Sequence, residues 1–190
     1  PGARGFGFIR RVPVSEQAAY LDRARADGEP DFSIRQLRPH DGERYVIEYI
    51  EPLASNRQAV GLDIASETNR RNAALAALTT GSVQLTGPIT LVQATGKPLQ
   101  SFLILMPIYR TGATPDSVEA RLREGYGWSY APLLTEDVLS SLLLSLENDG
   151  LQIRLSDVTD PATPVNFYQG DEPAGGLTQG LHQWREHEVY

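Results

Sequence analysis

The side chains that nucleophilic and metal-dependent enzymes use most often are scarce in this chain. It has no cysteine, which excludes a thiol nucleophile, a thiolate metal site and a disulfide framework. Its histidines are His40, His182 and His187, and no serine stands in a G-x-S-x-G segment that would expose it as a nucleophile. A helix would not bring His182 and His187 onto one face as H-E-x-x-H does. The sequence therefore predicts no catalytic residue and no metal site.

The glycine-rich and acidic segments do not match a phosphate-binding or calcium-binding motif. The segment 2–7 (GARGFG) lacks the following lysine of a phosphate loop and does not join a strand to a helix. The acidic residues within 63–68 and 157–161 lack the spacing of a calcium loop. Paired carboxylates meet only in space, so a hydrolase remains an alternative. It would require a histidine or an acid pair that converges in a cleft.

Length and composition limit the class of protein. The chain has 190 residues, 41% of them hydrophobic, which is enough for a substantial core without disulfides or metal. The formal net charge is -7, from 17 basic and 24 acidic residues, and no dense basic stripe is present. Nucleic acid is therefore excluded as a partner. The longest apolar run, 102–109, is too short to cross a membrane, and no cofactor is expected.

The N-terminal half predicts strands separated by two helices. Alternating apolar residues indicate strands over 5–12, 32–37 and 45–50, the last two of them neighbours. Ser15 is the expected N-cap of a helix that Gly28 ends. A second helix is expected over 66–80, with Ser66 as N-cap, a buried face of Ala74, Leu75 and Leu78, and Gly81 as its terminator.

The C-terminal half continues the alternation. Apolar residues within 83–91 and 102–109 predict a hairpin, and 116–125 predicts a short capped helix. A leucine stripe predicts an amphipathic helix over 135–149, followed by two strands within 151–169. Strands interrupted by short helices favour an α+β fold, with the 135–149 helix dividing a larger module from a smaller one.

A series of residues between 45 and 109 carries a family resemblance. Its members, in chain order, are Tyr45, Glu51-Pro52, Asn56, Gly61-Leu62-Asp63, Arg70-Arg71, Thr80-Gly81, Leu85-Thr86-x-Pro88, Leu91, Gln93 and Pro107-x-Tyr109. In order and spacing they resemble the CHASE domain, an extracytoplasmic sensor of receptor kinases and cyclases that include plant cytokinin receptors. The segment 125–139 is similar to a strand and helix of that family. The resemblance runs from about residue 6 to beyond residue 168.

The resemblance implies an architecture and a cellular setting. It implies an α+β fold of two PAS-like modules, with a membrane-distal ligand-binding module over 1–134 and an incomplete membrane-proximal module over 135–190. The family's N-terminal stalk helix is missing here, so we expect a monomer or weak dimer, from a parent receptor that is a homodimer. The expected location is the periplasmic side of a bacterial inner-membrane receptor with a histidine kinase or diguanylate cyclase/phosphodiesterase output.

The resemblance also implies a ligand site. In cytokinin-binding members an aspartate before a helix binds adenine and a leucine on the next strand faces the ligand, which correspond here to Asp63 and Leu85. The full set of expected ligand-binding residues is Asp63, Leu85, Thr86, Gln93, Tyr109 and Tyr126. Asp63 could equally accept hydrogen bonds from backbone N–H groups at a helix start, and Leu85 could belong to the core. Arg70 and Arg71 are expected to be exposed.

These observations predict a non-enzymatic sensor of a small molecule. An adenine-type ligand is one candidate, although Ala94 and Ser129 depart from the family pattern near it, so another small metabolite is equally open. The alternative is a protein-interaction module that docks a periplasmic binding protein. A cavity filled by Tyr or Leu side chains, with Asp63 satisfied by backbone groups, would favour that alternative.

Overall fold

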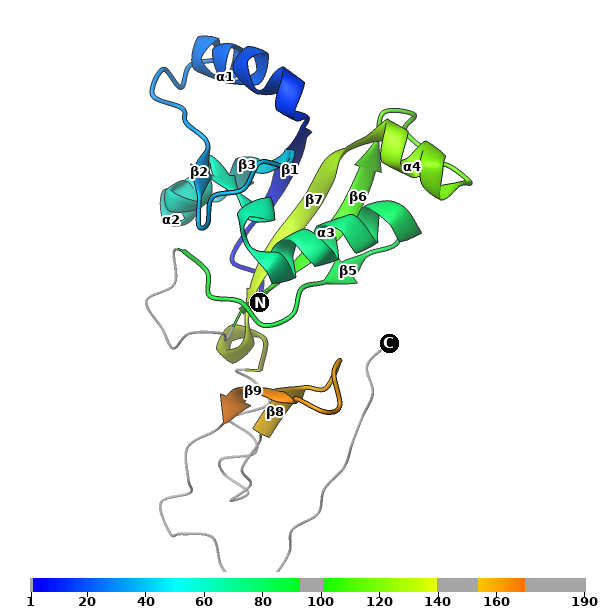
Figure 1. The fold of residues 1–190 in the computed structure, drawn as a ribbon. Helices are drawn as coiled ribbons and strands as arrows, with labels where there is room; N and C mark the ends of the chain where they lie inside the picture. Colours follow the sequence, from blue (N-terminus) through cyan, green and yellow to red (C-terminus); the bar gives the residue numbers. More distant parts are fainter. Residues whose placement is uncertain (1, 93–100, 140–153, 170–190) are drawn as a thin grey trace, which may run out of the picture.

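The structure of the chain is a computed structural model that describes residues 2–92, 101–139 and 154–169 (Figure 1). A seven-stranded sheet, a two-stranded sheet and several short helices give it an α+β fold, as the sequence predicts. The large sheet lies entirely within residues 6–134. Together with the helices that pack on it, the sheet positions the candidate site residues discussed below.

The large sheet is almost wholly antiparallel, and only its β2–β4 pair is parallel. In spatial order its strands are β2 (Arg35–Gln36), β4 (Leu62–Asp63), β3 (Arg44–Glu51), β1 (Phe6–Val12), β7 (Gly125–Leu134), β6 (Ser101–Tyr109) and β5 (Gln84–Leu85). The long strands β1, β3 and β6 are apolar along most of their length, and this explains why the sequence pattern predicted them.

Two expectations about the segment 32–37, at one edge of this sheet, were wrong. Only Arg35–Gln36 of the segment 32–37 forms a strand, and β4 separates it from β3, so these two strands are not neighbours. At the other edge, the hairpin expected between 83–91 and 102–109 is present in shorter form: Gln84–Leu85 pairs antiparallel with β6, and Ile89 forms an isolated bridge to Ser101. Strands of two residues have too few positions for an alternating pattern, so sequence periodicity cannot reveal them.

The helices begin at different residues from those expected. A 3-10 turn, Val14–Glu16, contains Ser15 and precedes α1 (Gln17–Ala26). Short turns follow over α2 (Leu53–Asn56), η2 (Arg57–Ala59) and η3 (Ile64–Ser66). The main helix α3 spans Thr68–Thr80, and α4 spans Val118–Glu124 with Ser117 as N-cap. Residues 135–139 begin a further helix, and the rest of the expected 135–149 helix lies outside the described residues.

The N-cap of α3 is Glu67 instead of the expected Ser66. The Glu67 carboxylate accepts hydrogen bonds from the backbone N–H groups of Asn69 and Arg70 at 3.0 and 3.1 Å. The Ser66 hydroxyl is occupied elsewhere, since it accepts from the N–H of Leu37 and donates to the carbonyl of Asp63. At the other end, Gly81 ends the helix in the left-handed conformation, as predicted.

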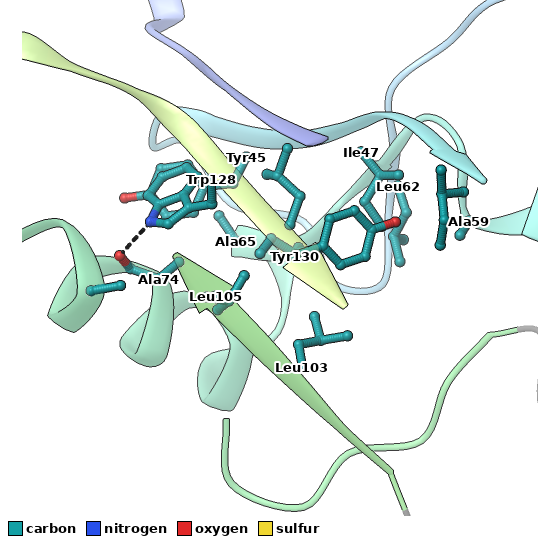
Figure 2. Packing of buried hydrophobic residues seen from close by; sticks show 14 of the residues in the cluster. Tyr45, Ile47, Ala59, Leu62, Ala65, Ala74, Leu103, Leu105, Trp128 and Tyr130 are labelled. Atoms are coloured by element: carbon teal, nitrogen blue, oxygen red, sulfur yellow. Dashed lines mark hydrogen bonds between the residues drawn. The ribbon is translucent and has the colours of Figure 1, made fainter. Parts of the chain in front are cut away.

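Helix α3 packs along one face of the sheet, over β6 and β7 (Figure 1). Two aromatic side chains of the sheet donate hydrogen bonds to helix carbonyls: Trp128 Nε1 to Ala74 at 2.9 Å and the Tyr109 hydroxyl to Leu78 at 2.7 Å. Figure 2 shows Trp128 and its bond to Ala74 among the buried residues of this core. These bonds fix the position of the helix along the strands as well as its distance from them.

On the opposite face of the sheet, helix α1 covers one end, as far as the described residues show. Alternate residues of β3 separate the two faces: Tyr45 and Ile47 join the core beneath α3, whereas Val46 packs with Val12 and with Tyr20 of α1. This second cluster is small, and Phe6, Tyr49 and Met106 remain exposed. Helix α1 therefore closes one end of this face and leaves a groove beside it.

A separate hairpin follows the large sheet. Strands β8 (Arg154–Asp157) and β9 (Val165–Gln169) pair antiparallel, in agreement with the two strands expected within 151–169. Phe167 of β9 contacts Phe102 of β6 edge-on, with 4.9 Å between ring centroids. The expected division into modules over 1–134 and 135–190 stays a prediction.

Candidate functional site

Asp63 is fully buried, and groups of the protein itself occupy its carboxylate. Oδ1 accepts hydrogen bonds from the backbone N–H groups of Tyr45 and Ala65, at 2.9 and 3.0 Å. Oδ2 lies 2.8 Å from His40 Nε2 and 3.8 Å from Arg44 Nε. Asp63 thus starts the short η3 turn by capping it and joins β3, β4 and the preceding loop.

His40 belongs to the same group of side chains. Its Nε2 faces Asp63, and the Arg44 guanidinium lies 3.1 and 3.2 Å from the two ring nitrogens and donates to the His40 carbonyl. Both nitrogens are therefore engaged, and neither is directed at a serine hydroxyl. His182 and His187 lie outside the described residues. In the described ranges, no three His, Cys, Asp or Glu side chains gather to form a metal site.

The other expected ligand residues lie apart from Asp63. Leu85 is 54% exposed on the edge strand β5. Thr86 is buried, and its hydroxyl accepts a hydrogen bond from the Leu103 N–H at 3.0 Å. Tyr109 is also buried and holds α3 through its bond to Leu78. Gln93 lies outside the described residues.

Tyr126 lies on the opposite face of the sheet from Trp128 and Tyr130. An irregularity in the β6–β7 register, between Ile108 and Tyr109, leaves Tyr126 beside Phe8 and Arg10. The structure therefore does not bring the described members of the expected ligand set together in one cavity. Strict alternation along β7 would have placed Tyr126 with Trp128, and only the register of the strands shows otherwise.

A small cavity lies between α3, η3 and the sheet. Its volume is about 10 Å³, the size of roughly one water molecule. The walls are almost entirely apolar. They are formed by Ile47, Ala59, Leu62, Ile64, Arg70, Leu91, Val92, Leu103, Tyr130 and Pro132. Figure 2 shows the Tyr130 ring extending toward Ile47, Ala59 and Leu62, with Leu103 on its other side.

Two polar groups border this apolar cavity. The Tyr130 hydroxyl is buried and has no hydrogen-bond partner among the described residues, and burial raises its pKa. Arg70 is 3% exposed, and its Nη2 donates to the Thr90 carbonyl at 2.8 Å. Burial lowers the pKa of Arg70, and the nearby Glu67 carboxylate opposes that change.

The expectation that Arg70 is exposed was wrong. Residues 70, 74, 77 and 78 form the buried face of α3, at the spacing of one helical face, whereas Leu75 is 42% exposed. The expected face of Ala74, Leu75 and Leu78 was therefore rotated from the real one. Counting the spacing from Arg70 instead of from the leucines would have identified the correct face.

The described part of the chain also carries two open grooves. One, of about 550 Å³, lies between the loop at 29–35 and the turns at 53–60. The other, of about 480 Å³, lies between α1 and the sheet and includes Tyr126. Across the described ranges, no helix combines the length and the apolar character needed to span a bilayer.

Comparison with known proteins supplies the family. No curated protein matches the sequence. The family model described as the CHASE domain matches residues 1–168 of the 190. The match covers the whole seven-stranded sheet and the β8–β9 hairpin up to Tyr168. The chain therefore belongs to the CHASE family, whose members are extracytoplasmic sensor domains of receptors.

Proposed function

We propose that this domain senses a small molecule for a bacterial transmembrane receptor, with a histidine kinase or a diguanylate cyclase/phosphodiesterase as its output, and that the ligand enters the cavity beneath α3. One observation carries the proposal. A small, mostly apolar cavity is lined by Tyr130, whose buried hydroxyl has no partner among the described residues. The buried guanidinium of Arg70 borders the same space.

The physical argument starts from the cost of burying polar groups. A buried hydroxyl without a hydrogen bond costs about 1–3 kcal/mol relative to a satisfied one. A ligand that offers an acceptor to Tyr130 recovers this cost, and apolar walls favour a ligand with an apolar body. Small-molecule sites commonly combine such walls with a few polar groups that set orientation.

The size of the cavity implies that binding changes the protein. About 10 Å³ cannot hold a metabolite. A ligand must therefore move α3 and η3 away from β6 and β7, against the hydrogen bonds of Trp128 and Tyr109. The ligand then stabilises an open arrangement over the closed one, and this difference in affinity is the signal. Coupling of this kind is usually worth about 1–3 kcal/mol.

The ligand contacts implied by the family resemblance stay predictions. Asp63 already accepts two backbone hydrogen bonds and faces His40 and Arg44. A ligand that binds Asp63, adenine-type or other, would have to displace one of these groups. For this reason the proposal rests on Tyr130 and Arg70 and leaves Asp63 as a structural residue.

A protein-interaction module is the second candidate, in which a periplasmic binding protein docks on the surface. Two observations favour it. The cavity is nearly filled by Tyr and Leu side chains, and the Asp63 carboxylate is satisfied within the protein. The exposed Phe6, Tyr49 and Met106 would be available for such docking.

Thermal-shift and calorimetric screening of the 190-residue chain against a metabolite panel with adenine derivatives distinguishes the two candidates. A ligand at 100 times its Kd stabilises the protein by about 2.7 kcal/mol. For a cavity ligand, Tyr130→Phe should weaken binding about tenfold, whereas Tyr49→Phe, at an exposed position, should leave it unchanged. A folded protein that no compound stabilises would favour the interaction module.

A further inference from the structure

The groove beside α1 has the volume of a ligand site and lies on the face of the sheet opposite the α3 cavity. At about 480 Å³ it falls within the range of small-molecule pockets. Three strands and the C-terminal part of α1 contribute to it. The residues used in the argument are Arg10, Tyr20, Arg23, Asp27, Glu48 and Tyr126.

Arg10 is held in place at the floor of the groove. Its guanidinium lies over the Tyr126 ring, 3.6 Å from the centroid, and Phe8 packs against the same ring at 5.6 Å. This cation–π contact restricts the long side chain before any ligand arrives. Arg10 therefore lines the groove with little conformational entropy left to lose when a ligand binds.

A buried hydroxyl lies among the charged groups. Tyr20 is 4% exposed, and its oxygen has no hydrogen-bond partner among the described residues. Burial raises its pKa, and the charges that act on it belong to Glu48, Arg10 and Arg23. The hydroxyl thus lies near all three charged groups, with its hydrogen-bonding capacity unused.

The charges of the groove are not neutralised by direct pairing. Within the described part of the chain, Arg10, Arg23 and Glu48 form no ion pair with one another or with other residues. Burial raises the pKa of the Glu48 carboxyl, and the opposing effect of Arg10 and Arg23 is smaller. Arg10 and Glu48 are partly buried, whereas Arg23 lies exposed at the rim of the groove. Partly desolvated charges such as those of Arg10 and Glu48 are unfavourable until a partner binds them.

We propose that this groove binds a free α-amino acid as its zwitterion. Arg10 and Arg23 bind the carboxylate, Glu48 binds the ammonium group, and the Tyr20 hydroxyl pairs with one of the two. The groove lining contains two arginines and two acidic residues, Asp27 and Glu48. A simple anion would pair only with the arginines, and a metal ion only with the carboxylates. A zwitterion pairs with both the arginines and the carboxylates.

Calorimetry of the 190-residue chain tests both the carboxylate and the ammonium contacts. The compounds are the proteinogenic L-amino acids, their N-acetyl derivatives and their amides. One or more free amino acids should bind. The N-acetyl derivative lacks the ammonium group and the amide lacks the carboxylate, so each should bind about ten- to a hundredfold more weakly. A derivative that binds as tightly as its free amino acid overturns the zwitterion proposal, and so does a folded protein that binds no amino acid.

Variants locate the binding. Glu48→Gln and Arg23→Gln should each weaken binding by about ten- to a hundredfold. Asp22→Asn, on the same helix but outside the groove lining, should have no effect. Tyr130→Phe should also have none, because the α3 cavity is a different site and this proposal does not depend on it. Amino acid binding that Tyr130→Phe abolishes, or that Glu48→Gln and Arg23→Gln leave unchanged, would show that the groove is not the site.

Discussion

Two buried tyrosines show how the hydrogen-bond partner of a hydroxyl decides its effect on stability. Tyr109 donates to Leu78 and connects the sheet to α3, whereas the Tyr130 hydroxyl has no partner among the described residues. We expect Tyr130→Phe to raise the free energy of unfolding by about 1 kcal/mol and Tyr109→Phe to lower it by a similar amount. Urea unfolding of both variants measures this. Equal effects would mean that the Tyr130 hydroxyl is satisfied in solution.

Glu48 gives a prediction about pH. Its folded-state pKa is raised above the ordinary 4.5, mainly because the carboxyl is buried. Its contribution to stability is therefore full below pH 4.5 and is lost as the pH rises through the folded-state pKa. Glu48→Gln should unfold at higher urea concentration than the unmodified chain at neutral pH, and the difference should shrink below pH 4.5.

The matched control for Glu48 is Glu119→Gln on α4, at an exposed position. It should change the urea midpoint little at either pH. If Glu48→Gln behaves like this control, the carboxyl is better solvated than its burial implies. If Glu48→Gln stabilises the protein and also abolishes amino acid binding, the Glu48 carboxylate lowers stability but is needed for binding. Such a combination is common at ligand sites.

At the scale of elements, the start of α3 depends on one carboxylate. Glu67 satisfies the N–H groups of both Asn69 and Arg70. Loss of an N-cap costs about 1 kcal/mol, so Glu67→Ala should destabilise the protein by about that amount. Glu67→Gln keeps an acceptor oxygen and should cost less. Thermal unfolding of the two variants measures both losses of stability. If the two losses are equal, the negative charge of Glu67 stabilises the helix, and its hydrogen bonds to the backbone do not.

At the scale of the whole molecule, the boundary near residue 135 is testable. The seven-stranded sheet uses only residues 6–134, and the contact of Phe167 with Phe102 joins it to the β8–β9 hairpin. If residues 1–134 form a module, a chain of residues 1–139 should fold by itself and unfold in one cooperative transition. Circular dichroism with urea unfolding measures this. A truncated chain without cooperative unfolding would place the boundary elsewhere.

The sequence by itself determined the class of protein and most of the long elements. The absence of cysteine, the scattered basic residues and the series of residues from Tyr45 to Tyr109 led to a sensor family that the family model confirms. The long strands β1, β3 and β6 and the Gly81 terminus of α3 followed from local patterns. Such features depend on neighbouring residues alone, so periodicity and capping rules can detect them.

Only the tertiary structure decided which polar groups are buried and what they face. Arg70 turns inward because Ala74, Ala77 and Leu78 fix the buried face of its helix. Tyr126 lies with Arg10 because the register of β6 against β7 shifts. Asp63 of β4 meets His40 of the loop between β2 and β3. These outcomes depend on contacts between residues far apart in the chain, and a shift of one residue in strand register reverses which face a side chain occupies.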